Sequence, residues 1–124
     1  MKLVVSSEDK NLEEDSGIIY IVLFRLDDKE LVKIGITTRT IEERVSEILV
    51  SMFKVYREFP YCRPKRFRKT SDIFEKEAIL HEHFKKYSYK PDKKFSGSSE
   101  FFDIPLDDVV VVYERLLAGE PLES

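Results

Sequence analysis

Four side chains that could do chemistry are spread along this chain: Tyr20, Arg44, Glu77 and His81. A phenol, a guanidinium, a carboxylate and an imidazole, delivered by separate elements with the last two on one helix, are the groups that cleavage of a phosphodiester bond would use. They are far apart in the sequence, so only a folded domain can bring them together. What the residues can do therefore depends on which elements carry them.

A β-hairpin is expected to come first. Residues 18–24 are all apolar apart from Tyr20, and a run of this length is typical of a central strand covered on both faces. After a short charged turn, residues 31–36 alternate with Lys33 and Gly35 in the pattern of a paired second strand. Gly35 would permit close approach of backbone or ligand at this strand.

A helix is expected to follow the hairpin. Thr40 and Glu43 have the spacing of a capping box. Apolar residues then recur at helical spacing: Ile41, Val45, Ile48, Leu49 and Met52. Arg44 lies at the margin of this apolar stripe, so it can point into a cleft rather than straight into water. A third strand is expected at 55–59, returning to the hairpin.

Asp72 and Glu75 form a second possible capping pair, opening a helix that runs to about Tyr87. Its apolar stripe reads Ile73, Leu80, Phe84 and Tyr87. Glu77 completes the pattern, and a carboxylate there costs several kcal/mol unless it has a partner. His81 lies one turn further along the same face. The spacing leaves open both a functional site and a pair of Glu77 with His81 or an arginine that only satisfies the core.

The C-terminal part is expected to contain a loop, a return to the core and a last helix. Residues 90–99 are polar, with Pro91, Gly97 and three serines, and could cover or flank a site. Residues 100–102 return to the core. Pro105 and the following acidic residues predict a helix start, and Gly119 predicts its end, so a helix is expected at 105–118.

The chain has 124 residues, of which 42% are apolar, so one domain with its own core is expected. Residues 1–16 are expected to be an N-terminal extension or linker and residues 17–120 the domain itself. Cys62 is the single cysteine, which excludes an internal disulfide. Neither a signal peptide nor a membrane span is expected, so the expected location is the cytoplasm.

Positive charge is concentrated in the middle of the chain. Residues 33–94 hold 16 Lys or Arg against 9 Asp or Glu, whereas the two flanks together hold 5 against 15. The net charge of −3 therefore conceals an uneven distribution, with a positive middle part and negative flanks. Seven cations, interleaved with aromatic residues, lie between positions 54 and 69: Lys54, Arg57, Arg63, Lys65, Arg66, Arg68 and Lys69. Such a mixture suits phosphates and base faces, although a solvated loop with aromatic anchors has the same composition.

The ordered set of motifs resembles the GIY-YIG nuclease superfamily, in its phage-type branch that is also seen in fungal meiotically up-regulated proteins. Gly17-Ile18-Ile19-Tyr20 is similar to the first signature with one residue inserted before its tyrosine. Lys33-Ile34-Gly35 stands where the second signature has Tyr-Ile-Gly. Each of these motifs falls on the strand already expected there.

The helical motifs continue the resemblance. Thr38-Arg39 and Glu43-Arg44-Val45 are similar to the first-helix motif of the branch. Glu77, Leu80, His81 and Phe84 match its Glu-x-x-Leu-His-x-x-Phe pattern, and Ser99-Glu100-Phe101-Phe102 is similar to its closing Gly-Glu-Trp-Phe segment. The resemblance covers residues 17 to 104 in order, and this order makes the set more specific than any single motif.

The resemblance implies an α+β fold in which a three-stranded antiparallel sheet, hairpin first in the order ββαβαα, is flanked by helices. It also implies hydrolysis of DNA, double-stranded by expectation, with one Mg²⁺ or Mn²⁺ ion per site. Arg44 would stabilise the phosphate charge in the transition state. Glu77 would be the metal ligand. Tyr20 would orient the attacking water or a phosphate oxygen, and Arg39 would join the nucleic-acid contacts.

Lys33 departs from the usual second signature, although the matching branch commonly shows lysine here. A tyrosine at this position has been assigned base or water-positioning work. Lys33 could act as a base only if burial or a neighbouring cation lowers its pKa. His81 is then the more natural proton carrier at neutral pH.

Two other classes of function remain open on the sequence. A catalytically inactive nucleic-acid-binding module is favoured if Glu77 and Arg44 neutralise each other in the core. A protein-interaction domain would use its acidic C-terminal helix to dock on a basic partner. A nuclease with one site in one small domain would nick, form a homodimer, or take its specificity from a partner protein. If the gene is carried by a phage, the cytoplasm would be that of the host.

Overall fold

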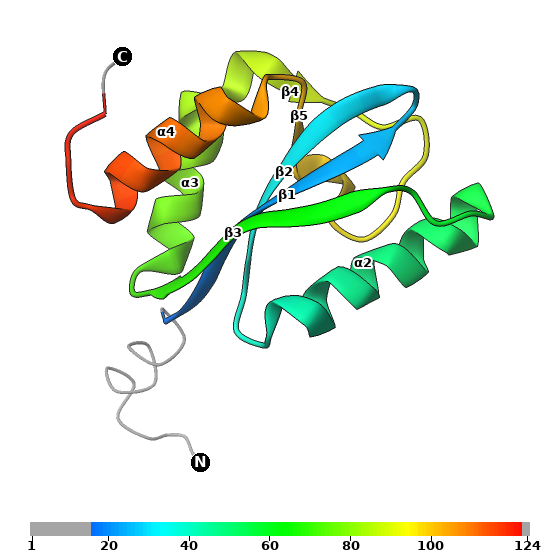
Figure 1. The fold of residues 1–124 in the computed structure, drawn as a ribbon, viewed down its shortest axis with the longest axis horizontal. Helices are drawn as coiled ribbons and strands as arrows, with labels where there is room; N and C mark the ends of the chain where they lie inside the picture. Colours follow the sequence, from blue (N-terminus) through cyan, green and yellow to red (C-terminus); the bar gives the residue numbers. More distant parts are fainter. Residues whose placement is uncertain (1–15, 123–124) are drawn as a thin grey trace.

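The computed structural model describes residues 16–122, which form an α+β fold with an antiparallel sheet and three α-helices (Figure 1). The expected N-terminal extension, apart from Ser16, lies outside the described residues. Helix bounds are α2 Ile41–Tyr56, α3 Ile73–His83 and α4 Leu106–Leu117, and strand bounds are β1 Gly17–Leu26, β2 Lys29–Thr37, β3 Cys62–Thr70, β4 Ser88–Tyr89 and β5 Phe101–Phe102. Over residues 16–122, every helix is too short or too polar to cross a membrane.

The expected hairpin is confirmed. Strands β1 and β2 pair antiparallel along their whole length, joined by Asp27 and Asp28 with φ of 53° and 62°. Two positive φ values in a two-residue turn match the right-handed twist of the strands. Tyr20 lies opposite Gly35, and a Cβ on that glycine would overlap the tyrosine ring. Because Gly35 has no side chain, the Tyr20 ring has room to lie over β2.

The sheet has five strands in the order β3-β1-β2-β5-β4, so the expected count of three is wrong. Strands β4 and β5 have only two residues each. Two residues cannot show a period in the sequence, because their assignment depends on the neighbours they pair with. Their presence means that the loop region before α4 forms one edge of the sheet.

The third strand was expected at 55–59 but lies at Cys62–Thr70, because α2 continues to Tyr56. Arg57 ends the helix in the left-handed conformation, with φ of 65°. The segment that follows is an edge strand rather than a basic loop. Its charged residues hide the alternation that would identify it, and Pro64 is tolerated next to the bulge opposite Ile21 and Val22.

The helix ends agree with the sequence in two cases and differ in one. In α2 the capping box is present, with the Glu43 backbone N–H donating to Thr40 Oγ1 at 3.1 Å. The last helix lies within the expected 105–118, and Gly119 follows it with φ of 78°. Helix α3 ends at His83 and a 3₁₀ turn takes the chain to Tyr87. The expected cap is wrong, because Asp72 is itself left-handed and makes no side-chain cap bond.

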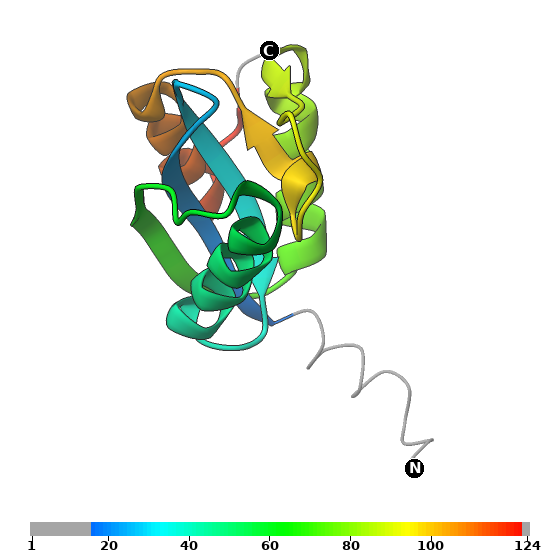
Figure 2. The ribbon, with the colours of Figure 1, turned by 90° about the vertical axis from the view of Figure 1, so that its right-hand side faces the viewer.

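The sheet has a hydrophobic cluster on each face, and Figures 1 and 2 show helices on both sides. Helix α2 packs on one face against the side chains of Tyr20, Val22, Phe24, Leu31 and Phe101. Helices α3 and α4 pack on the other face against Ile19, Ile21, Val32, Ile34 and Phe102. Alternate residues of each strand thus serve different helices. Arg44 and Glu77 consequently start from opposite layers.

At the edge of β2, side chains from one face of the sheet can reach the other face. Strand β5 pairs with β2 only at Val32 and Lys33, so the ladder stops before Ile34. Helix α3 lies against the remainder of that edge, and His81 Nε2 is 2.9 Å from the Ile34 carbonyl oxygen. Side chains of α3 can therefore pass the end of β5 and reach the face that α2 covers.

Candidate active site

Tyr20 and Lys33 supply the floor of the candidate site. Both side chains are fully buried, and both lie on the face of the sheet covered by α2. Lys33 Nζ lies 5.4 Å from the centroid of the Tyr20 ring and 5.9 Å from that of Phe101. Strand alternation explains the placement, because the neighbours Val32 and Ile34 belong to the opposite core. The sheet thus places an ammonium group among aromatic rings.

Arg44 reaches the same site from α2. Its side chain is only 16% exposed, as expected for a residue at the margin of the apolar stripe. Nη1 donates a 3.2 Å hydrogen bond to Ser96 Oγ and forms an ion pair with Glu47. Burial lowers the pKa of Arg44, but contacts with the Tyr20 hydroxyl and Glu47 outweigh burial and raise it. The Tyr20 hydroxyl nevertheless has no hydrogen-bond partner of regular geometry within residues 16–122.

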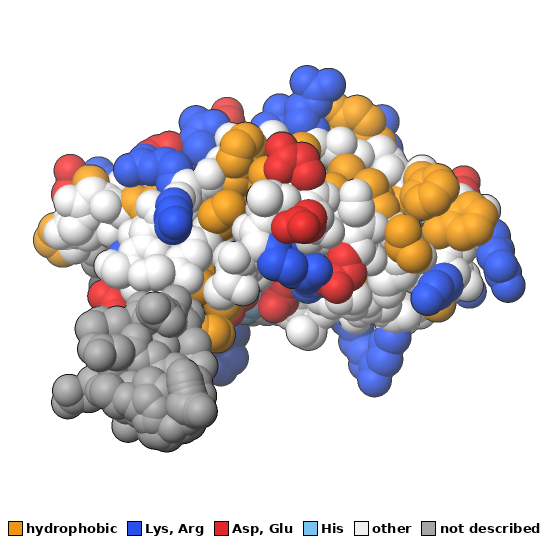
Figure 3. Space-filling model, turned by 90° about the horizontal axis from the view of Figure 1, so that it is seen from below, with side chains coloured by type: hydrophobic (Ala, Val, Ile, Leu, Met, Phe, Trp, Pro, Cys, Tyr) orange, Lys and Arg blue, Asp and Glu red, His pale blue; other side chains and the backbone are white. Residues whose placement is uncertain are grey.

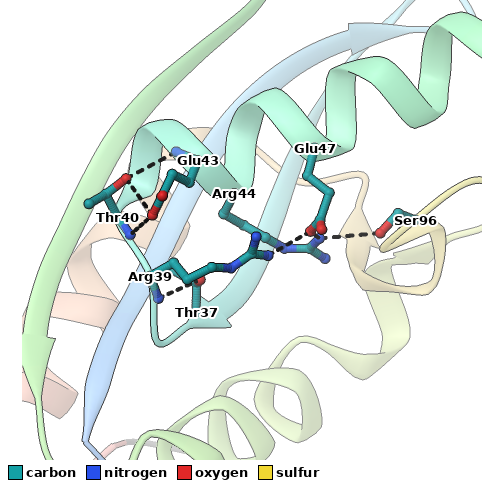
Figure 4. Close-up of polar contacts among 7 residues, drawn as sticks. All are labelled: Thr37, Arg39, Thr40, Glu43, Arg44, Glu47 and Ser96. Atoms are coloured by element: carbon teal, nitrogen blue, oxygen red, sulfur yellow. Dashed lines mark hydrogen bonds and ion pairs between the residues drawn. The ribbon is translucent and has the colours of Figure 1, made fainter.

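Glu47 joins two arginines, as Figure 4 shows. Its Oε1 accepts hydrogen bonds from Arg44 Nη1 and from Arg39 Nη2, the latter at 2.9 Å. The Arg39 backbone N–H donates to Thr37 Oγ1 at 3.1 Å, which fixes the turn before α2. One carboxylate oxygen thus occupies the point on which two guanidinium groups converge. A phosphate oxygen could take the same position.

Glu77 has fewer hydrogen-bond and ion-pair partners than a carboxylate on an apolar stripe needs. Its side chain is 18% exposed, and the buried Oε2 has no hydrogen-bond partner in the described part of the chain. His81 Nε2 is 3.8 Å away, at the limit of an ion pair. Burial, with a smaller effect from Glu100, raises the pKa of Glu77 to about 7, against the opposing effects of Lys33 and Arg44. Glu77 is therefore a carboxylate that a cation would stabilise.

His81 lies beside Glu77 but is held by the sheet. Because a carbonyl oxygen only accepts, the Nε2 that lies 2.9 Å from Ile34 O must carry the proton of that bond. The ring also packs edge-on against Phe102, with centroids 5.1 Å apart. In this arrangement Nδ1 is the nitrogen left for proton transfer. Its role as proton carrier stays a prediction.

Glu100 belongs to the site and was not assigned to it from the sequence. It forms an ion pair with Lys33, and it is close enough to Glu77 to raise the pKa of that carboxyl. A buried lysine in a strand requires a counter-ion, which is a signal that the sequence does contain. The partner could not be identified, because the two residues are 67 positions apart and meet only through a two-residue strand.

The loop before β5 closes over the two cations. Gly97 has φ of +81°, and a Cβ on it would lie 2.8 Å from Lys33 Nζ and 3.4 Å from Arg44 Nη2. The glycine is needed both for the backbone conformation and for this close approach. The expectation that residues 90–99 flank a site is consistent with this contact.

The carboxylates suit the hard cation that the resemblance implies. Magnesium keeps several waters and takes one or two protein carboxylates, and Glu77 offers a buried oxygen without a hydrogen bond. Glu100 is its nearest acidic neighbour. Among the residues that the structure describes, no set of three or more His, Cys, Asp or Glu side chains is arranged to hold a metal ion. The fit is therefore to a water-rich magnesium site and not to a closed metal cage.

A pocket of about 300 Å³ opens beside this cluster, between the start of α2 and the start of α3. It is lined by Arg39 and Arg44 on one side and by Phe74 on the other. A larger hollow of about 970 Å³ lies between α3 and α4 and contains none of the clustered residues. The smaller pocket is the relevant one, because convergent charged groups define a site better than size does.

The seven cations expected to contact nucleic acid are divided between two places. Arg66 and Arg68 both bind Glu114 of α4, with N–O distances of 2.8 Å, so their charge is partly neutralised within the chain. Lys54 and Arg57 lie exposed at the end of α2. Figure 3, seen from below, shows basic side chains at both ends of the molecule and mixed charges between them. None of these residues is part of the central cluster.

An exposed aromatic pair accompanies the cations at the end of α2. Phe53 and Phe59 stack with centroids 4.8 Å apart, and Phe59 is 61% exposed. Side chains of this kind can stack on bases. The pair belongs to the mixed aromatic and basic segment noted in the sequence.

The match to a known family covers the whole of this arrangement. The T5orf172 domain profile matches residues 17–117, and the chain therefore belongs to the T5orf172 domain family. These are nuclease-like, DNA-binding domains found in phage and related proteins. No curated protein and no solved structure gives a significant match.

Proposed function

We propose that the chain is a metal-dependent endonuclease of the GIY-YIG type that hydrolyses phosphodiester bonds of DNA. The observation that carries the proposal is the convergence of Tyr20, Lys33, Arg44 and Glu77, from β1, β2, α2 and α3, on one partly buried site. Membership of a nuclease-like family supports it. A buried hydroxyl and a buried carboxylate oxygen without hydrogen bonds are unusual in a core and are expected where substrate or a cation completes the bonding.

Each residue has a role that its surroundings support. Arg44 would bind the phosphate in the transition state, once Glu47 has released it. The Tyr20 hydroxyl, which has no regular hydrogen bond among residues 16–122, would orient water or a phosphate oxygen. Lys33 is engaged in an ion pair with Glu100, and in that pair it would act as a fixed cation. His81, through Nδ1, is the remaining proton carrier.

Glu77, whose buried Oε2 has no hydrogen bond within residues 16–122, would hold one Mg²⁺ or Mn²⁺ ion. Such an ion would neutralise phosphate charge and promote ionisation of water at neutral pH. The protein would hold this centre away from bulk solvent, because Lys33 and Tyr20 are fully buried beneath it.

The catalytically inactive alternative has lost its main support. It was favoured if Glu77 and Arg44 neutralised each other, but the hydrogen bonds of Arg44 go to Glu47 and Ser96. The interaction-domain alternative relied on the acidic C-terminal helix, yet Glu114 of that helix is engaged by Arg66 and Arg68 of the same chain. A cytoplasmic location, double-stranded DNA as substrate, and a homodimer or a specificity-giving partner stay predictions.

The test is conversion of supercoiled plasmid to open circles with Mg²⁺ or Mn²⁺. Wild type should nick, and Glu77→Gln should not. Glu75→Gln is the matched control, because it removes the same charge from an exposed position of the same helix and should nick normally. Absence of nicking by the wild type with either metal would overturn the proposal in favour of a binding module.

A further inference from the structure

Lys33 is the one charged side chain that is buried within residues 16–122. A buried ammonium group is costly unless a carboxylate is fixed close to it. Glu100 provides that carboxylate, and the Tyr20 and Phe101 rings enclose the ammonium group. The position of this cation is therefore determined by the residues around it rather than by a flexible side chain in solvent.

The strand register explains why Glu100 can reach Lys33. Phe101 is the residue of β5 that pairs with Lys33, and Glu100 directly precedes it. The 3₁₀ turn Ser98–Glu100 leads into this pair, so the carboxylate enters from the end of the strand. A two-residue strand buries little by itself. Its placement of Glu100 against Lys33 and Phe101 against Phe24, with ring centroids 5.3 Å apart, ties it to the sheet.

The same segment also holds Arg44. Ser96 accepts a hydrogen bond from Arg44, and its backbone N–H donates to Ser51 Oγ of α2 at 2.8 Å. Gly97 lies directly over both cations, since a Cβ there would be within 3.4 Å of Lys33 Nζ and of Arg44 Nη2. The ammonium and the guanidinium groups therefore both lie next to Gly97, and residues 96–100 contact both of them.

We propose that Glu100 is a positioning residue: it acts through Lys33, holding the ammonium group at a set place beside Arg44 so that two cations face one phosphate. The inference rests on the proposed nuclease function. A purely structural ion pair would have no reason to adjoin the unpaired oxygens of Tyr20 and Glu77. If Arg44 binds the phosphate, the Lys33 ammonium group beside it would add to the stabilisation of the charge that develops there, because preorganised cations are most effective at such a place.

The experiment uses Glu100→Gln, which keeps the size of the side chain and a hydrogen-bond acceptor but removes the charge. Glu114→Gln is the matched control, because it removes a carboxylate that serves two arginines away from the site. Single-turnover nicking of plasmid, at an Mg²⁺ concentration that saturates the wild type, should fall about 10- to 100-fold in Glu100→Gln, with affinity for a short duplex, measured in EDTA, within about threefold of wild type. Glu114→Gln should nick at the wild-type rate.

A spectroscopic measurement reports on Lys33 directly. In protein labelled with ¹⁵N-lysine, the Lys33 ammonium signal should be visible in wild type and Glu114→Gln, and shifted or broadened in Glu100→Gln. Glu100→Asp serves if Glu100→Gln does not fold, because it keeps the charge and withdraws it by one methylene. It should also slow nicking and shift the signal.

If the wild type nicks and the folded Glu100→Gln variant nicks at the same rate, the inference is overturned and the proposed function stands. The same follows from an unchanged Lys33 signal, or from full recovery of the variant by more Mg²⁺, which would make Glu100 a metal ligand instead. Absence of nicking by the wild type would overturn the proposed function itself.

Discussion

The two faces of the sheet each bury a tyrosine, and the two differ in one respect. Tyr113, on the face covered by α3 and α4, donates to the Ile19 carbonyl oxygen at 2.7 Å and accepts from the Arg68 N–H at 3.1 Å. Tyr20, on the α2 face, is equally buried but has no such partners among residues 16–122. A fully satisfied hydroxyl contributes to stability, whereas an unsatisfied one costs free energy unless it serves another purpose.

The carboxylates of the two faces differ in the same way. Glu114 binds two arginines, whereas Glu77 Oε2 accepts no hydrogen bond within residues 16–122 and has His81 Nε2 3.8 Å away. On the α4 side, Tyr113 and Glu114 thus have hydrogen-bond and ion-pair partners. On the α2 side, the Tyr20 hydroxyl and Glu77 Oε2 have no hydrogen-bond partner within residues 16–122. The comparison predicts that changes on the two sides will affect different measurements.

The largest effect should come from Arg44→Ala. If the guanidinium stabilises the transition state, cleavage should fall by about 100- to 1,000-fold, with DNA affinity nearly unchanged. Arg68→Ala, on the α4 side, should leave the single-turnover rate within about threefold of wild type. Plasmid nicking and duplex binding measure both. A loss of affinity as large as the loss of rate would contradict the role given to Arg44.

The tyrosines offer a direct reciprocal test. Tyr20→Phe has no regular hydrogen bond to lose and removes an unsatisfied buried hydroxyl, so its free energy of unfolding should equal that of wild type or exceed it by up to about 1–3 kcal/mol, while nicking falls at least about tenfold. Tyr113→Phe should lose about 1–3 kcal/mol of stability with little change in nicking per folded molecule. Urea unfolding and single-turnover nicking decide it. Equal loss of stability in both variants would erase the distinction between the faces.

The raised pKa of Glu77 predicts a pH-dependent gain of stability in Glu77→Gln. The folded protein binds a proton between the ordinary pKa of 4.5 and about 7, which the unfolded chain releases, so Glu77 lowers stability progressively as pH rises through that window. Without divalent cations, the variant should exceed wild type by about 2 kcal/mol at pH 8 and by little at pH 4. A constant difference across this range would contradict the assignment.

The smallest effect concerns Glu47, which occupies the point where Arg39 and Arg44 converge. Glu47→Gln should tighten duplex binding about two- to fivefold, the equivalent of one exposed ion pair. Glu42→Gln is the control, because it removes the same charge from an exposed position on α2. Equal tightening in both variants would show a general charge effect without displacement of Glu47.

Local patterns in the sequence were enough to predict several of the elements that carry the candidate residues. The hairpin, the capping box of Thr40 and Glu43, and the placement of Arg44 at the edge of an apolar stripe are short-range features, and the structure confirms them. Glu77 was singled out because it is a carboxylate at a position where the helical spacing of apolar residues calls for an apolar side chain. Such signals survive because each depends on residues less than two helical turns apart.

Features that depend on distant partners could not be predicted. Strand β3 is an edge strand whose charged side chains obscure its period, so it was expected too early in the chain. Glu100 is defined by a strand that exists only through its pairing with β2. The engagement of Arg66 and Arg68 by Glu114 likewise depends on how α4 folds back. In each case tertiary contacts, not local propensity, determine the outcome.

The early end of β5 has a consequence for how the domain could be altered. Because β5 pairs with β2 only at Val32 and Lys33, it leaves a gap along the rest of the β2 edge. Side chains of α3 reach the opposite face of the sheet through this gap. Two more residues of β5, paired with Ile34 and Gly35, would lengthen the sheet and strengthen it while closing that gap. A stabilising extension would thus separate Glu77 from Arg44. Insertions are better placed at the β1–β2 turn, on the far end of the hairpin.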